Sequence, residues 1–199
     1  MRVIAGTYRS RILKSLKGLA LRPTSDRLRE TLFNVLGPNV SGARFLDLFA
    51  GTGAIGIEAL SRGATEVVFI ENHSPAAKLI RKNLDSLGIR SGFTVLAADA
   101  LRGLEKLVSR QKGTGPGFDY IFLDPPYAAA EDYARVLEFL GSTDLLAPGT
   151  IVVAEHRRNF DLGEEAGALR RFRVLRQGDA ALSFYRRRGE YGGENNSAE

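Results

Sequence analysis

Three acidic side chains stand at or near the ends of three successive apolar segments: Asp47, Glu71 and Asp99. The segments, residues 45–49, 66–71 and 93–98, have the length and composition typical of buried parallel strands. The carboxyl ends of parallel strands meet at one edge of an open sheet, where ligands bind. Three carboxylates at that edge can hold a ligand that carries positive charge and hydrogen-bond donors.

A glycine-rich loop follows the first of these segments. Gly51, Gly53 and Gly56 spell G-x-G-x-x-G between the strand and a helical pattern, the context that a nucleotide-binding loop requires. The first two glycines let the backbone turn sharply close to a ligand, and the third lets helix and strand pack tightly. Asp47 would repel a pyrophosphate, whereas it would attract the sulfonium and ammonium groups of S-adenosylmethionine. The loop therefore favours S-adenosylmethionine over a dinucleotide as the cofactor.

The other two acids have separate expected roles toward such a cofactor. Glu71 lies twenty residues after Gly51, a spacing that lets its carboxylate accept hydrogen bonds from both ribose hydroxyls. Asp99, at the end of the third segment, would accept a hydrogen bond from the adenine amino group. We expect Asp47, Gly51, Gly53, Glu71 and Asp99 to form the cofactor site.

A fourth apolar segment, residues 118–124, delivers a tetrapeptide to the same edge: Asp124, Pro125, Pro126 and Tyr127. The exocyclic amine of a base is a poor nucleophile because its lone pair is delocalised into the ring. A carboxylate and a backbone carbonyl that accept both N–H bonds can aim the lone pair at a methyl group, and two prolines hold these acceptors rigid. Tyr127 offers a face on which an extruded base can stack. The tetrapeptide therefore indicates methyl transfer to an exocyclic amine.

Strands and helices alternate along the chain around these residues. Helical patterns cover residues 74–87, 100–110 and 131–140, and further strands are predicted at 149–155, 169–176 and 180–187. This alternation predicts an α/β fold of the Rossmann-like class I S-adenosylmethionine-dependent methyltransferase type, with a mostly parallel seven-stranded sheet and helices on both faces. We place this domain at residues 24–188 and expect residues 189–199 to be a disordered tail.

Basic side chains are concentrated at the amino-terminal end. The net charge is +5, yet residues 1–30 hold eight basic and two acidic side chains and thus carry +6. We predict that residues 1–23 form a β-hairpin or extended arm, and that a helix begins after Thr24 or Ser25. A basic segment on a near-neutral body is typical of nucleic-acid binding, with a solvated basic face as the alternative. The cations expected to contact RNA are Arg2, Arg9, Arg11 and Lys14.

The composition also argues against several classes of protein. The 199 residues include no cysteine and two histidines, so a disulfide framework and a thiolate zinc site are excluded and no metal is expected. No apolar run approaches the roughly 18–20 residues of a membrane span, and the amino terminus lacks the apolar core of a secretory signal. We expect a cytoplasmic protein without membrane contact.

Taken together, these residues resemble the bacterial RsmD family of methyltransferases. The resemblance runs from about residue 2 to residue 187, and its most specific part is R-P-T-S-D-R-L-R-E-T-L-F-N at residues 22–34. Residues 45–56 and 124–127 are shared with amino-methyltransferases in general. Ala5 and Ser10 stand where the family has glycine, which bears on the geometry of the arm and not on catalysis.

The resemblance implies a reaction and a substrate. The reaction is methylation of the exocyclic N2 of a guanine in small-subunit (16S) ribosomal RNA, at position 966. The resemblance also implies that S-adenosylmethionine is bound by the Gly51 loop, Glu71 and Asp99, with catalysis at residues 124–127. The expected substrate is 16S rRNA within the small ribosomal subunit or an assembly intermediate, and the expected enzyme is a monomer.

Three other functions fit part of the pattern. A DNA or RNA adenine-N6 methyltransferase would use the same chemistry, but the chain has little room for the separate target-recognition domain that DNA enzymes usually need. A nicotinamide-dependent oxidoreductase would explain the glycine loop and Glu71, yet it leaves Asp47, Asp99 and Asp124 without a role. A non-catalytic RNA-binding module on a Rossmann-like scaffold would gain nothing from carboxylates beside RNA.

Overall fold

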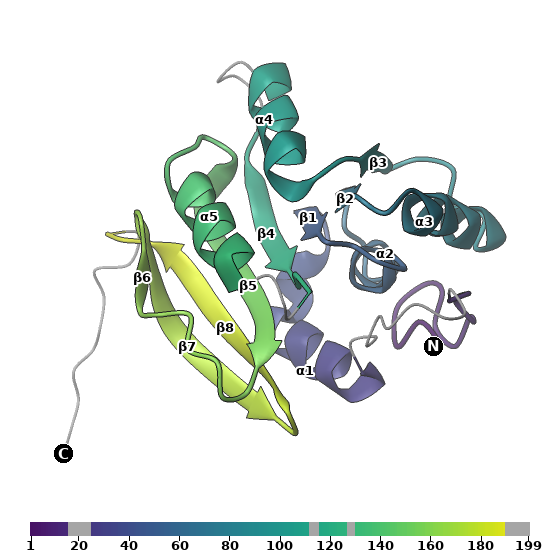
Figure 1. The fold of residues 1–199 in the computed structure, drawn as a ribbon. Helices are drawn as coiled ribbons and strands as arrows, with labels where there is room; N and C mark the ends of the chain where they lie inside the picture. The colour runs from purple at the N-terminus through teal and green to yellow at the C-terminus, as the bar shows by residue number, and fades with distance from the viewer. Residues whose placement is uncertain (16–24, 112–115, 127–129, 190–199) are drawn as a thin grey trace.

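A single sheet of eight strands runs through the computed structural model, which describes residues 1–15, 25–111, 116–126 and 130–189 (Figure 1). The strands are β1 (Arg44–Leu48), β2 (Glu66–Glu71), β3 (Phe93–Ala97), β4 (Phe118–Leu123), β5 (Leu146–Arg157), β6 (Glu165–Ala166), β7 (Leu169–Gln177) and β8 (Ala180–Arg187). The helices are α1 (Asp26–Leu36), α2 (Ala54–Ser61), α3 (Ser74–Ser86), α4 (Ala100–Gln111) and α5 (Ala130–Gly141), with a short 3₁₀ helix η1 (Gly37–Val40).

The sheet is parallel over five strands and antiparallel at one end. Its order is β3-β2-β1-β4-β5-β8-β7-β6, and β1 pairs in parallel with β2 on one side and with β4 on the other. The chain therefore reverses its direction of winding between β1 and β4, which is the point at which open α/β sheets bind ligands. The predicted mostly parallel sheet is confirmed, with one strand more than the predicted seven. The extra strand, β6, has two residues, too few to show a strand pattern in sequence.

Helices cover both faces of the sheet, as predicted. On one face, α1, α2 and α3 pack on a core that includes Phe33, Phe45 and Phe122. On the other face, α4 and α5 pack on a second core through side chains such as Leu104 and Leu137. Figure 1 shows α5 and α4 over the β5 and β4 side of the sheet and α2 and α3 beside β1, β2 and β3.

The amino-terminal residues fold back onto the domain instead of extending from it. Arg2 and Ile12 form an antiparallel bridge that closes residues 1–15 into a loop, and Val3 and Leu13 are buried against the α1–α3 core. The helix α1 begins at the predicted position, because the Ser25 Oγ accepts the Leu28 N–H at 3.1 Å. Residues 16–23 of the predicted arm and 190–199 of the predicted tail lie outside the described residues.

Two features are absent from the described part of the chain. No helix in it has the length and the apolar character needed to cross a membrane. The same residues contain no group of three or more histidine, aspartate or glutamate side chains placed to hold a metal ion.

Candidate active site

The first predicted acid, Asp47, is buried in β1. Its Oδ2 accepts the backbone N–H of Gly56 at 2.9 Å, which ties the strand to the first turn of α2. Burial raises the pKa of Asp47 to about 8, with a smaller contribution from the negative charge of Glu71, and the Gly56 N–H works against this increase. The burial of Asp47 therefore favours its protonated form.

The glycine loop has the geometry that its three glycines predict. Gly51 and Gly53 have φ angles of 54° and 77°, in the left-handed region that favours glycine, and Gly53 is the residue before α2. A Cβ atom on Gly56 would lie 2.3 Å from the ring of Phe69, so only glycine lets α2 approach β2 this closely. The three glycines therefore determine the conformation of the loop and of the start of α2.

Glu71, at the end of β2, faces the same loop. Its Oε2 accepts the Gly51 N–H at 2.7 Å and its Oε1 accepts the His73 N–H at 2.8 Å. Each carboxylate oxygen has two acceptor positions, so both can still accept a hydroxyl of a ligand. Glu71 thereby holds the loop in place and presents acceptors at the strand ends.

Asp99 follows β3 and precedes α4. Its side chain is exposed, and its Oδ1 accepts the Leu101 N–H at 3.1 Å. Asp99 thus precedes the amino-terminal end of α4, where acidic residues are favoured at helix starts. Asp47, Glu71 and Asp99 therefore stand at the carboxyl-end side of three neighbouring strands, as the sequence predicts.

Asp124 stands beside a carboxylate that the sequence analysis did not single out. Leu123 at the end of β4 is paired with Ala154 of β5, so the next residues, Asp124 and Glu155, lie side by side at the edge of the sheet. Glu155 is buried. The sequence signal for it was the same as for the other acids, since Glu155 ends the apolar segment 149–155 that is predicted as a strand.

The surroundings of Asp124 change its acidity. Burial raises the pKa of Asp124 well above its usual range, and the nearby charges of Glu155 and Asp47 raise it further. A carboxyl group with a raised pKa is a better proton acceptor once it is ionised. Of the two prolines that follow, Pro125 is buried and Pro126 is exposed. Tyr127 lies outside the described residues.

Two polar residues of α2 hold the amino-terminal loop. Glu58 is fully buried: its Oε2 accepts the Ile4 N–H at 2.7 Å, and its Oε1 accepts the Ala5 N–H at 3.0 Å. The Ser61 Oγ accepts the Tyr8 N–H at 3.0 Å. A glutamate inside an otherwise apolar helix was the signal in the sequence for such a buried contact.

Asn83 of α3 connects the amino-terminal loop with the glycine loop. This side chain is fully buried. Its Oδ1 accepts the Lys14 N–H at 2.9 Å, and its Nδ2 donates to the carbonyls of Lys14 and Thr52, each at 3.1 Å. Thr52 lies between Gly51 and Gly53, so one amide group fixes both segments.

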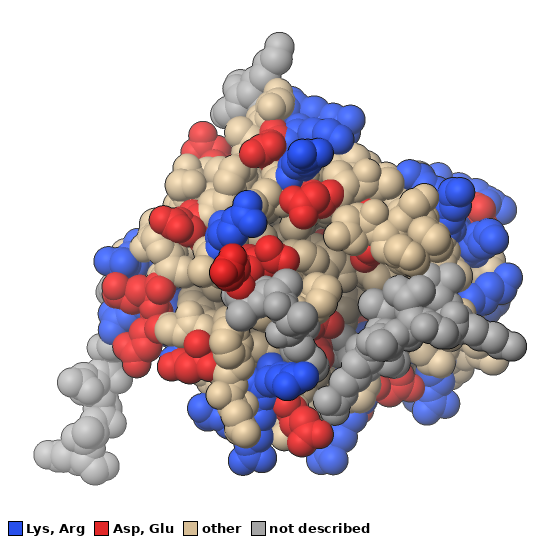
Figure 2. Space-filling model, viewed as in Figure 1, with Lys and Arg blue, Asp and Glu red and all other residues tan. Residues whose placement is uncertain are grey.

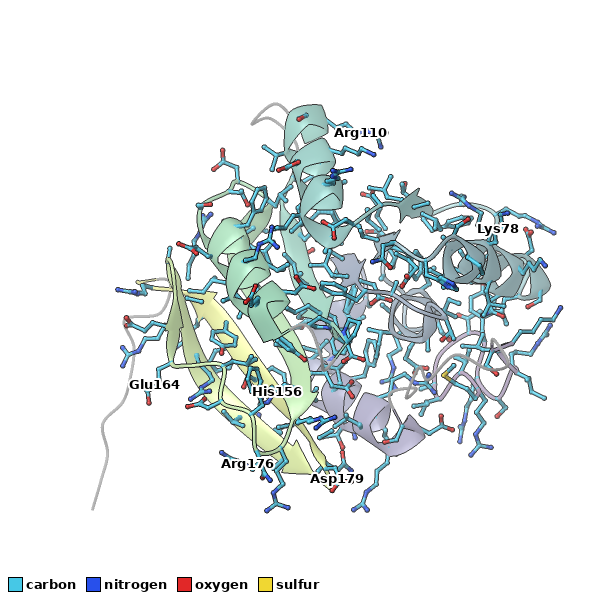
Figure 3. The ribbon with its side chains drawn as sticks, viewed as in Figure 1. Lys78, Arg110, His156, Glu164, Arg176 and Asp179 are labelled. Atoms are coloured by element: carbon cyan, nitrogen blue, oxygen red, sulfur yellow. The ribbon has the colours of Figure 1, made fainter. Side chains whose placement is uncertain are left out.

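Two of the four cations expected to contact RNA contact different helices. All four side chains are exposed. The Arg11 guanidinium donates to the Ser86 carbonyl at the end of α3, at 3.3 Å. The Arg2 Nε lies 3.7 Å from the Asp26 Oδ2 at the start of α1. In the view of Figure 2, other basic side chains gather over α3 at the right and over α4 at the top; Figure 3 labels Lys78 and Arg110 there.

A comparison with protein families shows which family the chain belongs to. The family model described as Conserved hypothetical protein 95 matches residues 1–186. The chain belongs to the RsmD family. The Ribosomal RNA small subunit methyltransferase D of Haemophilus influenzae is 37% identical over 161 residues, which cover 80% of this chain and 80% of that protein. The RsmD resemblance drawn from the sequence is confirmed.

Solved structures share the fold of the RsmD-family chain. The hypothetical protein TTHA0928 of Thermus thermophilus superimposes with a TM-score of 0.74 at 30% identity, covering 92% of this chain and 98% of that one. An RNA methyltransferase from Salinibacter ruber in complex with S-adenosyl-L-homocysteine gives a TM-score of 0.60 at 20% identity, covering 81% and 91%. The fold is therefore that of S-adenosylmethionine-dependent methyltransferases, which use the cofactor predicted from the sequence.

Proposed function

We propose that this RsmD-family chain transfers a methyl group from S-adenosylmethionine to the exocyclic N2 of a guanine in small-subunit ribosomal RNA. The observation that carries the proposal is the line of carboxylates on adjacent strand ends, from Asp99 through Glu71 and Asp47 to Asp124. The name of the Haemophilus influenzae relative, a small-subunit ribosomal RNA methyltransferase, supports the class of substrate.

The glycine loop and three acids fit S-adenosylmethionine. In this proposal Glu71, which also accepts the Gly51 N–H, accepts hydrogen bonds from the ribose hydroxyls, and the exposed Asp99 accepts one from the adenine amino group. When bound, the cofactor supplies an electrophilic methyl group on a cationic sulfur. Because an opposite charge favours the ionised form of a carboxyl group, Asp47 is expected to lose its proton when this cation binds.

Asp124 is proposed to prepare the amine and to take its proton. Its side-chain oxygen and a backbone carbonyl of the following turn would accept the two N–H groups of the guanine amine and direct the nitrogen lone pair. As the nitrogen–carbon bond forms and the sulfur–carbon bond breaks, the amine gains a positive charge and releases one proton. An ionised Asp124, with its raised pKa, is suited to accept this proton.

The proposal also covers the target nucleotide, the form of the RNA substrate, the oligomeric state and the residues that contact RNA. We infer from the family membership that the target is the guanine at position 966 of 16S rRNA, presented by the small subunit or an assembly intermediate. We also propose that the enzyme acts as a monomer, with Tyr127 stacking on the target base and with the arm cations Arg2, Arg9, Arg11 and Lys14 holding RNA phosphates.

The test is to incubate the purified protein with labelled S-adenosylmethionine and small subunits or 16S rRNA from cells that lack the gene. Nucleoside mass spectrometry should then detect N2-methylguanosine, and primer extension should map it to one position. Methyladenosine in place of methylguanosine would support the adenine-N6 alternative. Intact cofactor binding without methylation of either substrate would contradict the proposed substrate, and Asp124→Ala is the control for the chemical step.

A further inference from the structure

A second basic region lies at the antiparallel end of the sheet. Residues 157–188 contain nine arginines and four acidic side chains, a net charge of +5. The two exposed phenylalanines of the described chain, Phe160 and Phe172, both lie in this region, with 37% and 41% of their surfaces exposed. Aromatic side chains among arginines are typical of surfaces that bind nucleic acid.

Phe172 stands at an irregularity of the β7–β8 pair. The register of the pair shifts between Arg171 and Arg173, so Phe172 is the additional residue of a β-bulge, which redirects its side chain. The ring centroid lies 6.2 Å from that of the fully buried Phe184, and the Arg186 guanidinium lies 5.0 Å from it. The Phe172 ring therefore packs against the buried Phe184 and lies beside the Arg186 guanidinium at the surface.

Three arginines share this face of the hairpin. Arg170 is paired with Arg186 and Arg173 is paired with Phe184, and paired residues of neighbouring strands point to the same side of a sheet. Like charges directly opposite each other repel across a sheet. A bound polyanion would remove this repulsion. We name Arg170, Phe172, Arg173 and Arg186 the basic-aromatic face.

The basic-aromatic face and the amino-terminal loop belong to the same layer of the molecule. Phe184 lies in the core that α1, α2 and α3 share with Val3 of the amino-terminal loop. Figure 1 shows the amino-terminal loop and the β7–β8 hairpin at opposite sides of the molecule, with α1 between them. β4, which delivers Asp124, is near the middle of the strand order. Tyr185, next to Arg186, pairs with Val152 of β5, three residues before Glu155, so the face lies toward the amino-terminal ends of the parallel strands and away from Asp124.

We propose that the basic-aromatic face is a second RNA-binding surface, which holds a part of the substrate RNA away from the target base. The proposal rests on the proposed function, since it takes RNA as the substrate. The arginines would contact phosphates, and Phe172 together with the Arg186 guanidinium would stack on an unpaired base. The basic-aromatic face would add to the RNA binding of the amino-terminal loop without taking part in catalysis.

The experiment compares two double variants that remove equal charge. Arg170→Gln/Arg173→Gln changes the basic-aromatic face, and Arg102→Gln/Lys106→Gln changes a basic cluster on α4, on the opposite face of the sheet. Binding of 16S rRNA and of small subunits is measured over a salt series for both. The hairpin variant should reduce the slope of log affinity against log salt by about 1.4–1.8, the value for two phosphate contacts, and the α4 variant should not.

A single variant separates stacking from charge. Phe172→Ala should weaken RNA binding about tenfold with an unchanged salt slope, because stacking involves no counterion release. Binding of S-adenosyl-L-homocysteine by all variants should equal the wild type, which shows that they fold. Equal effects of the two double variants, or none, would overturn the proposal while leaving the wild-type methylation intact. Loss of binding to small subunits alone, with normal binding to rRNA, would mean that the face contacts a protein and would also overturn it.

Discussion

The strand-end acids and the surface cations of this chain are held in different ways. Asp47 and Glu71 are buried and accept hydrogen bonds from the backbone of the glycine loop. The cations Arg9 and Lys14, by contrast, are exposed on the amino-terminal loop. A methyl transfer requires one fixed geometry of the reacting groups. The binding energy for RNA, by contrast, can be divided among many flexible contacts. We therefore expect changes at the acids to have large effects and changes at single cations to have small ones.

The largest effect is expected at Asp124. Asp124→Ala should lower turnover on the order of 10²–10³-fold, because a preorganised acceptor and the proton acceptor are both removed. Affinity for S-adenosyl-L-homocysteine should change far less. Single-turnover methylation and calorimetry measure the two quantities. Asp124→Asn keeps an acceptor oxygen but takes no proton, so it should retain more activity than alanine; near-normal turnover in both variants would contradict the role.

The buried acid Asp47 should make stability depend on pH. Its folded pKa of about 8 lies above the ordinary value, so the folded state binds more protons than the unfolded state between about pH 4 and pH 8. Stability should therefore fall as the pH rises through this range, by up to a few kcal/mol. Urea unfolding at several pH values without cofactor measures this. Asp47→Asn should flatten the profile, and an unchanged profile would show that Asp47 is not responsible.

A smaller effect is expected at Glu71. Glu71→Ala should weaken binding of S-adenosyl-L-homocysteine roughly ten- to a hundredfold, since it removes the charge-assisted hydrogen bonds to the ribose and the bond to Gly51. Glu71→Gln should have a smaller effect because it keeps one acceptor. Calorimetry with each variant gives the affinities. Equal affinity of Glu71→Ala and the wild type would remove Glu71 from the cofactor site.

The smallest effect for each side chain is expected on the amino-terminal loop. The quadruple alanine variant of Arg2, Arg9, Arg11 and Lys14 should flatten the dependence of log affinity for RNA on log salt, by about 0.7–0.9 for each phosphate that is no longer bound. No single cation of the four should dominate. Cofactor affinity serves as the control. An unchanged slope of log affinity against log salt would mean that these cations only face solvent. RNA would then bind to other surfaces, such as the β7–β8 hairpin.

The parts that the sequence predicted well depend on local pattern. Asp47, the glycine loop and Glu71 lie within one strand–helix–strand unit, so their spacing alone indicates how they meet. Glu58 and Asn83 were missed because their partners lie 53 or more residues away in the amino-terminal loop. Such contacts depend on how the loop folds back, which no local periodicity records. The charge of the β7–β8 hairpin is less evident in the sequence for another reason, since acids elsewhere in the chain hide it in the total.

One consequence follows from the three hydrogen bonds of Asn83. If either the amino-terminal loop or the glycine loop moved away, a buried donor or acceptor would lose its partner, at a cost of about 1–3 kcal/mol. The two segments are therefore ordered together, although one is proposed to contact RNA and the other the cofactor. A ligand that makes one segment rigid reduces the conformational entropy that the other must lose. Thermodynamic linkage requires that any such effect of one substrate on the affinity for the other be reciprocal.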